Sequence, residues 1–277
     1  MYSLFLVKNI KGGILISRFC PLFSGSSGNS TFVGTSQYGI LVDIGCSYKC
    51  TKSALMDRGI TPEDICAVAV THTHSDHTQG LKTFLKKHPV PVIASRITLD
   101  ALVENAIITD THPTLCADDG MINVCDITLK KISTSHDCDG SVGYIFSLPD
   151  ERKIAVFTDL GCISDEILDS IKGCDLVMLE SNHDINMLKK GNYPFYLKER
   201  ILSDCGHLSN AACAAVLPTL VKNGTTRIVL AHLSRENNLP TLALSTAKSA
   251  LIDAGLREDI DYILYVAPVR DGRMFIL

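Results

Sequence analysis

The stretch AVAVTHTHSDH, residues 67–77, decides how this sequence is interpreted. Its first four residues form an apolar run that is typical of a buried strand. Residues two apart in an extended segment point the same way, so His72 and His74 are expected to face one metal ion. The chain then turns into a helix predicted to start near Thr78, which redirects Asp76 and His77 toward a second ion. Imidazoles combined with a carboxylate favour zinc, iron or manganese over calcium or magnesium.

Short apolar runs alternate with helical segments on both sides of this motif, which predicts a layered α/β architecture. We expect strands at 40–42, 67–70, 90–93, 142–146, 154–157, 176–179 and 228–230, and helices at 48–58, 81–87, 164–172, 210–221 and 241–253. Pro91 favours an edge position for its strand. Residues 121–147 and 261–277 suggest antiparallel hairpins, the second with a tight turn at Asp271-Gly272. One domain over residues 1–277 is expected, with residues 1–16 as an extension or extra edge strand.

Composition limits the classes of protein that remain. The 277 residues are 46% hydrophobic and 20% charged, which allows a sizeable core and excludes disorder. A net charge of −4 means that nucleic acid must be held locally, and 6% aromatics without Trp argue against a broad base-stacking platform. Eleven cysteines without a CxxC pair are interpreted as buried, reduced thiols of a cytoplasmic protein. No apolar run approaches the length of a membrane span, so no membrane partner is expected.

THTHSDH is similar to the signature of the metallo-β-lactamase-fold superfamily, and later motifs follow that superfamily's order. His136 in STSHD resembles the third histidine ligand, Asp159 in VFTD the bridging carboxylate, and His232 in LAHLS the last histidine. Asp43 in LVDIG resembles the buried aspartate that supports the metal loop. The resemblance implies an α/β fold (α+β in some schemes), a four-layer αββα sandwich with the site at the edge of its two sheets.

The resemblance also implies a site for two divalent transition metal ions, zinc, manganese or iron. The implied ligands form two sets and a bridge: His72, His74 and His136 for the first ion, Asp76, His77 and His232 for the second, and Asp159 between them. Two cations that share a carboxylate make hydroxide available from a bridging water at neutral pH. Asp76 is further expected to accept a hydrogen bond from that hydroxide and orient it.

Four segments resemble the YycJ/WalJ-type metallohydrolases of this superfamily: FSGSSGNS (23–30), LESNHD (179–184), GHLSN (206–210) and AHLSRENN (231–238). That resemblance implies a phosphodiesterase with 5′-to-3′ exodeoxyribonuclease activity and DNA as its partner. Glu180 and His207 look like the pair of the tRNA 3′-processing nucleases, in which a carboxylate orients a histidine that protonates the leaving oxygen. Phosphodiester cleavage expels an alkoxide and therefore needs such an acid. A structural histidine near a helix N-cap is the alternative interpretation of His207.

Substrate contacts are predicted from weaker signals. The loop 23–30 could present backbone N–H groups to phosphate, although a plain turn explains it too. Ser26, His183 and Arg235 are the candidate contacts, and for His183 a structural role is an equal alternative. The inserted domain with which RNA-processing relatives clamp polynucleotide is missing. The basic residues near the motifs, four of which also fit a solvated helix face, are Lys189, Lys190, Lys198, Arg200 and Arg235.

Two other functions remain as alternatives. A thioester hydrolase of the glyoxalase II kind shares the THxHxDH motif, but it would lack the Glu180–His207 pair and carry a basic patch for glutathione. A regulatory or scaffold role is the third alternative, and the complete set of ligand residues argues against it.

Overall fold

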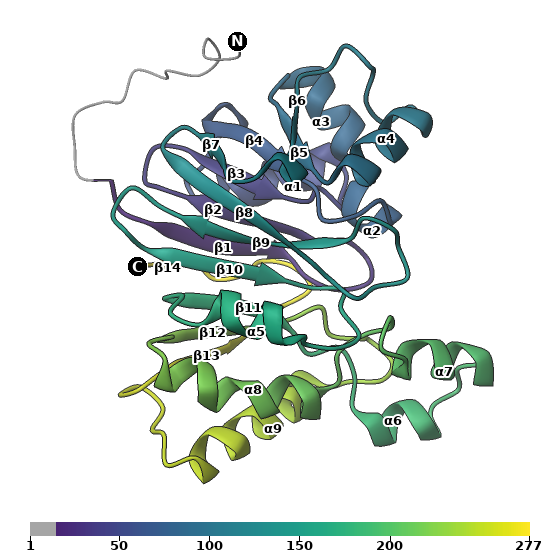
Figure 1. Ribbon diagram of the computed structural model, residues 1–277, viewed down its shortest axis with the longest axis vertical. Helices are drawn as coiled ribbons and strands as arrows, with labels where there is room; N and C mark the ends of the chain where they lie inside the picture. The colour runs from purple at the N-terminus through teal and green to yellow at the C-terminus, as the bar shows by residue number, and fades with distance from the viewer. Residues whose placement is uncertain (1–14) are drawn as a thin grey trace.

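The computed structural model describes residues 15–277 as two mixed β-sheets packed face to face, with helices on both outer faces (Figure 1). The order of the first sheet is β14 (Phe275–Ile276), β1 (Arg18–Phe23), β2 (Ser30–Gly34), β3 (Gly39–Val42), β4 (Ile65–Ala69), β5 (Val92–Ala94) and β6 (Thr114–Cys116). The order of the second is β13 (Ile263–Val266), β12 (Arg227–Ala231), β11 (Leu176–Glu180), β10 (Lys153–Phe157), β9 (Val142–Ser147), β8 (Ile127–Ser133) and β7 (Ile122–Val124). The expected four-layer α/β sandwich is confirmed.

Helices cover the two outer faces in the order of the chain. The first sheet is covered by α1 (Tyr48–Met56), α3 (Leu81–Lys87) and α4 (Arg96–Glu104), and the second by α5 (Asp165–Ile171), α8 (Asn210–Lys222) and α9 (Pro240–Asp253). The remaining short elements are α2 (Ser75–Thr78), α6 (Ile185–Lys190), α7 (Phe195–Leu202) and the 3₁₀ turns η1 (Pro62–Asp64) and η2 (Ala117–Asp119). No helix among residues 15–277 is long and apolar enough to cross a bilayer.

Strands such as β3 and β4 are apolar along their whole length because both faces of the sheet are covered there. In β4 every residue is buried. Cys66 and Ala69 belong to the core between the sheets, whereas Ile65 and Val68 pack under the helices of the outer layer. This double burial explains why the run before the histidine motif shows no alternation of polar and apolar residues.

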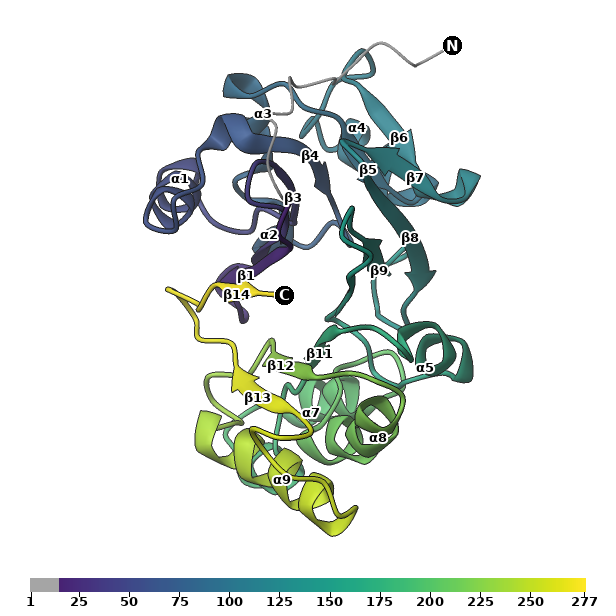
Figure 2. The ribbon, with the colours of Figure 1, turned by 90° about the vertical axis from the view of Figure 1, so that its left-hand side faces the viewer.

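The prediction of a hairpin over residues 261–277 is wrong. β13 runs parallel to β12 in the second sheet, and β14 pairs antiparallel with β1 in the first. Asp271 turns the chain with a φ of 63°, but the turn carries the chain from one sheet to the other (Figure 2). The hairpin predicted within 121–147 is confirmed as the antiparallel series β7, β8 and β9.

Three smaller expectations need comment. The strand at Pro91 is an interior strand, not an edge strand, because Pro91 precedes β5 and its carbonyl accepts a hydrogen bond from the Val68 N–H at 3.0 Å. The extension or strand expected at residues 1–16 lies almost entirely outside the described residues. All eleven cysteines are free, but only four are buried and Cys205 is exposed, so the expectation of general burial is wrong.

Candidate metal centre

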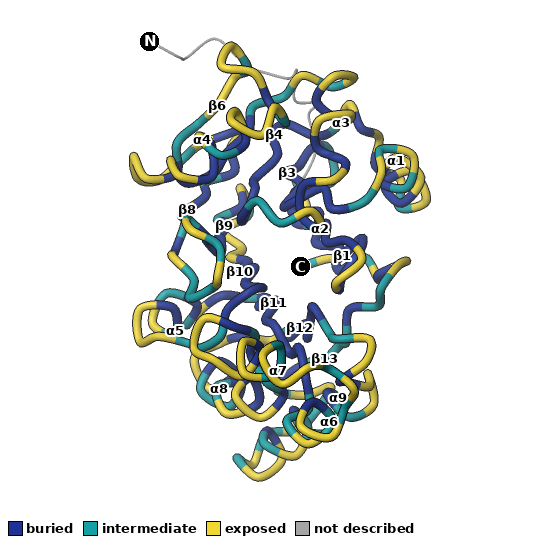
Figure 3. The backbone as a smooth tube through the Cα atoms, turned by 90° about the vertical axis from the view of Figure 1, so that its right-hand side faces the viewer, coloured by how far each residue is buried: buried dark blue, intermediate teal, exposed yellow. Residues whose placement is uncertain are grey.

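The predicted ligands follow the ends of strands in both sheets, on the side of the molecule shown in Figure 3. The motif 71–77 follows β4 and enters α2. His136 comes after β8, Asp159 after β10 and His232 directly after β12. The structure brings side chains from both sheets to one place, as strand ends at a common edge permit.

The first predicted set of ligands is assembled around three imidazoles. One ligand atom from each of His72, His74 and His136 lies within 4.8 Å of the others. The Nδ1 of His136 lies 3.2 Å from the carbonyl of Gly206, which leaves its Nε2 facing His74 Nδ1 at 3.4 Å. A hydrogen bond from one ring nitrogen to a carbonyl fixes the orientation of a histidine whose other nitrogen binds a metal ion.

The second predicted set lies beside the first. Asp76, His77 and His232 also offer ligand atoms within 4.8 Å of one another. Asp159 lies between the sets, since its Oδ2 is 3.2 Å from His77 Nε2 and its Oδ1 is 3.8 Å from His136 Nε2. The Asp159 carboxylate therefore lies close to a residue of each predicted set.

Three buried polar atoms of this cluster have no hydrogen-bond partner among the described residues: His72 Nε2, His232 Nε2 and Asp159 Oδ2. Buried polar atoms are normally paired, so a group of unpaired donors and acceptors indicates a site for something else. Nitrogen and carboxylate ligands in this combination fit a divalent transition metal ion. The cluster therefore fits the ions that the sequence implies.

The charges in the cluster also favour a cation. Burial raises the pKa of Asp159, but His232 and His77 outweigh burial and hold that pKa well below its usual value. Burial lowers the pKa of His77, but the carboxylates of Asp159 and Asp43 raise it to about 10. In this cluster the carboxylates attract the positive charge of protonated histidines. A bound metal ion would supply positive charge at the same place.

Asp43 supports the motif 71–77 through hydrogen bonds to Thr71 and His77. One oxygen of its buried carboxylate accepts a hydrogen bond from the Thr71 N–H at 2.8 Å, and the other from the Thr71 hydroxyl at 2.8 Å. The second oxygen also accepts from His77 Nδ1 at 2.8 Å. This last contact fixes the proton on Nδ1 and directs His77 Nε2 toward the cluster.

The backbone is turned sharply where three of these residues leave their strands. Asp43, Asp159 and His232 have φ values of 60°, 58° and 56°, in the left-handed region that non-glycine residues seldom occupy. Each such conformation is strained and persists only when surrounding contacts enforce it. The Ser24 hydroxyl, which accepts a hydrogen bond from the His232 N–H at 2.8 Å, is one such contact.

Glu180 joins two histidines through one oxygen. Its Oε1 accepts hydrogen bonds from His207 Nδ1 at 2.9 Å and from His232 Nδ1 at 2.7 Å. Its Oε2 accepts from the backbone N–H groups of Leu160 and Leu208. Burial raises the pKa of Glu180, but His207 and His232 outweigh burial and lower it to about 2. Burial lowers the pKa of His207, but Glu180 outweighs burial and raises it.

The predicted substrate contacts differ in their surroundings. Arg235 is exposed and donates a hydrogen bond to the Ser27 hydroxyl at 2.7 Å, so it adjoins the loop 23–30 without contacting Ser26 itself. His183 is buried, and neither ring nitrogen has a partner among the described residues. Burial lowers the pKa of His183 to about 4, although Glu180 raises it. At neutral pH His183 therefore offers a hydrogen bond rather than a charge.

Two polar residues at the site were missed. The Asn29 amide donates a hydrogen bond to Asp76 Oδ2 at 3.2 Å and lies 3.0 Å from His77 Nε2. Asp137 accepts a hydrogen bond from Arg200 Nε and lies 3.3 Å from His136 Nε2. Both were visible in the quoted motifs, at the end of FSGSSGNS and of STSHD, but nothing in the sequence distinguishes them from ordinary turn residues.

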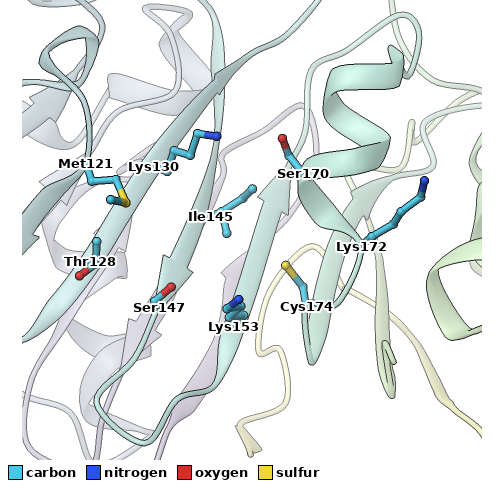
Figure 4. Close-up of a pocket in the computed structure, with 9 residues that line it drawn as sticks. All are labelled: Met121, Thr128, Lys130, Ile145, Ser147, Lys153, Ser170, Lys172 and Cys174. Atoms are coloured by element: carbon cyan, nitrogen blue, oxygen red, sulfur yellow. The ribbon is translucent and has the colours of Figure 1, made fainter. Parts of the chain in front are cut away.

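A separate hollow of about 170 Å³ lies on the outer face of the second sheet, between β8, β9, β10 and α5 (Figure 4). Lys130, Lys153 and Lys172 are among its lining residues, and no predicted site residue is. Lys153 begins β10, whereas Asp159 follows the other end of that strand. The hollow is therefore distinct from the metal centre.

Comparisons with known proteins agree with this geometry. The family model described as a beta-lactamase superfamily domain matches residues 39–233. The chain is 38% identical over 241 residues to exodeoxyribonuclease YycJ of Bacillus anthracis, covering 86% of this chain and 90% of the relative. It is 35% identical over 251 residues to exodeoxyribonuclease WalJ of Streptococcus pneumoniae, covering 90% and 93%.

Among solved structures, the metallo-β-lactamase fold protein YhfI from Bacillus subtilis matches with a TM-score of 0.70 at 15% identity, covering 95% of this chain and 100% of that one. This match concerns the fold alone. The chain belongs to the metallo-β-lactamase-fold superfamily, in its YycJ/WalJ-type branch.

Proposed function

We propose that this chain is a dinuclear metal-dependent phosphodiesterase that degrades DNA from the 5′ end toward the 3′ end. The observation that carries the proposal is the hydrogen bond between Glu180 and His207 beside the cluster of predicted ligands. The two relatives named as exodeoxyribonucleases, which match along nearly their whole length, support DNA as the substrate.

Two ions suit the cluster because, among its overlapping groups of possible ligand atoms, the two predicted sets lie on either side of the Asp159 carboxylate. His72, His74 and His136 would hold the first ion, with Asp159 shared. Asp76, His77 and His232 would hold the second. When bound, such ions polarise the phosphodiester and activate water at neutral pH. Availability decides between zinc, manganese and iron for a ligand set of this kind.

The chain's own residues supply the proton that the leaving group needs. His207 is the general acid in this proposal, because Glu180 raises its pKa, which favours the protonated imidazole, and 20% of its side chain is open to solvent. Glu180 orients the ring through Nδ1, so Nε2 is the atom that delivers the proton. Asp76 lies at the partly open side of the cluster, with 25% of its side chain exposed, and is assigned to orienting the attacking water.

The substrate is gripped near the cluster in this proposal. Arg235 and the backbone of the loop at Ser26 contact phosphate from one side. His183 donates one hydrogen bond to the same phosphate or to a bridging water. A cytoplasmic location fits the eleven free cysteines.

The thioester hydrolase alternative is less well supported, because a thiolate leaves readily without a proton and such a reaction gives no reason for the Glu180–His207 pair. The test compares 5′- and 3′-labelled DNA with S-lactoylglutathione, using protein loaded with manganese or zinc. We expect shortening of DNA from its 5′ end and no thioester cleavage. Thioester turnover that exceeds DNA cleavage would reverse the assignment.

A leaving-group test examines His207 directly. His207→Ala should slow DNA cleavage by roughly 10²–10⁴-fold, the contribution expected of a general acid. Hydrolysis of methyl p-nitrophenyl phosphate should fall far less, since nitrophenolate leaves without a proton. Equal losses on both substrates at full metal content would show that His207 contacts phosphate or shapes the site instead.

A further inference from the structure

Arg200 lies in the last turn of α7, and its side chain reaches the segment that carries His136. Its Nε donates a hydrogen bond to the Asp137 carboxylate, whose Oδ1 lies 3.3 Å from His136 Nε2. Lys198 of the same helix instead donates to the carbonyl of Lys189, away from the predicted ligands. Of the basic residues on this part of the chain, Arg200 is thus the one that contacts a metal-binding motif.

The last turn of α7 also packs against the segment that carries the proposed general acid. The His207 N–H donates a hydrogen bond to the Ile201 carbonyl at 3.0 Å. A Cβ on Gly206 would lie 2.3 Å from the carbonyl oxygens of Arg200 and Ile201, so only glycine permits this approach. Arg200 is therefore held beside His207 by its backbone, and beside His136 by its side chain.

Most of the Arg200 guanidinium remains available to a ligand. The group has five N–H donors, and only the donor on Nε is used by residues 15–277. The Arg200 side chain is 52% exposed, whereas the Asp137 side chain that it contacts is 27% exposed. The free donors on the two Nη atoms suit the oxygens of a phosphate, which arginine binds in a forked geometry.

Each predicted set of ligands has one arginine near it. Arg200 adjoins His136 of the first set, through Asp137. Arg235 donates a hydrogen bond to the loop 23–30, which in turn contacts the second set. Two arginines at different sides of one centre are placed to hold a chain of phosphates rather than a single phosphate.

Arg200 stands behind Asp137 and not among the ligand atoms. The ions would hold the phosphate under attack, so the Arg200 donors are left for another phosphate of the same strand. We propose that Arg200 binds a backbone phosphate adjacent to the scissile one, and thereby favours polynucleotides over isolated phosphodiesters. This inference rests on the proposed function and specifies a contact that selects its substrate.

The test compares DNA with a substrate that has only one phosphate. Initial rates of the metal-loaded enzyme give KM and kcat for methyl p-nitrophenyl phosphate and for 5′-phosphorylated duplex DNA, in which the first bond cleaved has a phosphate on each side. Arg200→Ala should raise the KM for DNA about 10- to 100-fold, as expected for lost hydrogen bonds between charged groups, with a smaller effect on kcat. Metal content and both constants for the small substrate should stay at wild-type values.

The salt dependence of the KM for DNA provides a second measurement. Each phosphate contact releases about one counterion, so the slope of log KM against log salt concentration should decrease by about 1 in Arg200→Ala. Arg200→Lys keeps the charge but loses the forked geometry. Its slope should match that of the wild type, and its KM should lie between those of the wild type and Arg200→Ala.

Two control variants address other causes of a raised KM. Removal of Arg200 leaves the Asp137 carboxylate unpaired, and that charge alone would repel DNA. The double variant R200A/D137N removes the charge as well, and its KM should remain raised. Arg152→Ala is the matched control, because Arg152 forms a similar pair with Asp175 beside the start of β10, and it should behave as wild type.

An unchanged KM for DNA in Arg200→Ala, or a normal KM in R200A/D137N, would overturn the inference and leave the nuclease proposal intact. Equal losses on both substrates would also overturn it, because Arg200 would then act on the metal centre itself. A wild-type enzyme that hydrolyses the small substrate but not DNA would overturn both proposals together.

Discussion

Glu180 serves two histidines with one carboxylate oxygen, and this sharing connects the proposed general acid to the metal ligands. His207 and His232 both donate to Oε1, and two backbone N–H groups fill Oε2. The side chain is completely buried, so water cannot replace a lost contact. A change at Glu180 should therefore affect both proton donation and metal binding.

Glu180→Gln should lower metal affinity by about 10- to 100-fold, the usual cost of losing a contact that orients a ligand. The amide can present one oxygen but not the charge that holds two histidines. Metal analysis after dialysis, with DNA cleavage measured alongside, checks the prediction. His207→Ala is the control, since it removes the acid and should leave metal content unchanged. Full metal content in both variants would contradict the role of Glu180 at His232.

The clustering of the proposed ligand residues and the support from Asp43 could be predicted because these residues sit in an ordered set of motifs, but other contacts of the cluster could not. Asn29 contacts Asp76 and His77 only after distant segments come together, and sequence spacing carries no record of such contacts. His183 illustrates the same limit, because its burial and unpaired ring nitrogens depend on neighbours far along the chain.

At the scale of elements, the start of α2 is positioned by close contact between three backbone segments. The Asn29 N–H donates to the carbonyl of Asp76 at 2.7 Å, and the Gly45 N–H donates to the carbonyl of Asn29 at 2.8 Å. A Cβ on Gly45 would lie 1.7 Å from the Asp76 carbonyl oxygen, so only glycine fits. The placement of Asp76 and His77 depends on that approach.

Gly45→Ala should push α2 outward and reduce DNA cleavage by about 10²-fold or more, as expected for misplacement of reacting groups by about 1 Å. Overpacking should also cost about 1–3 kcal/mol of unfolding free energy. Gly59→Ala is the control, because its added methyl group meets open space although its φ is +68°. Activity assays distinguish the two, because Gly59→Ala is strained by its positive φ and should also lose stability. Equal activity in both variants would show that the backbone around Gly45 can move to accept the methyl group.

Secondary structure was predicted best where burial is uniform and worst where strands are short or paired at a distance. The strands β4, β10, β11 and β12 can be recognised in the sequence from their apolar runs. The placement of β13 and β14 in different sheets cannot be recognised in this way. A turn motif indicates only that the chain reverses, and not which sheet the next strand joins. The bounds of α7 were not predicted, although Lys198 and Arg200 were taken to fit a solvated helix face, because its exposed aromatic residues interrupt the pattern of one apolar face.

At the scale of the molecule, the proposed ligands come from both sheets. His72, His74, Asp76 and His77 follow β4 of the first sheet, and the others follow strands of the second. Ions held between them would join the two halves of the sandwich and stabilise only the folded state. Metal content should therefore control the stability of the whole chain.

Removal of metal by a chelator should lower the unfolding temperature by about 5–10 °C relative to protein with metal at a hundredfold excess over its Kd. Calorimetry with and without added manganese or zinc measures the difference. Asp159→Ala removes the proposed bridge and should abolish most of the metal-dependent shift. If the unfolding temperature of the wild type is the same with and without metal, a metal site shared between the sheets would be contradicted.

The division of the chain between the sheets also orders events during synthesis. Apart from β14, the first sheet is built from residues 18–116 and the second from residues 122–266. Synthesis proceeds from the N-terminus, whereas a domain generally folds as a unit. A nascent chain that has formed only its first sheet would carry the THTHSDH motif but neither the bridging carboxylate nor the proton donor. The proposed nuclease activity therefore requires residues from both sheets, and it can arise only after both halves of the sandwich have been synthesised and have packed together.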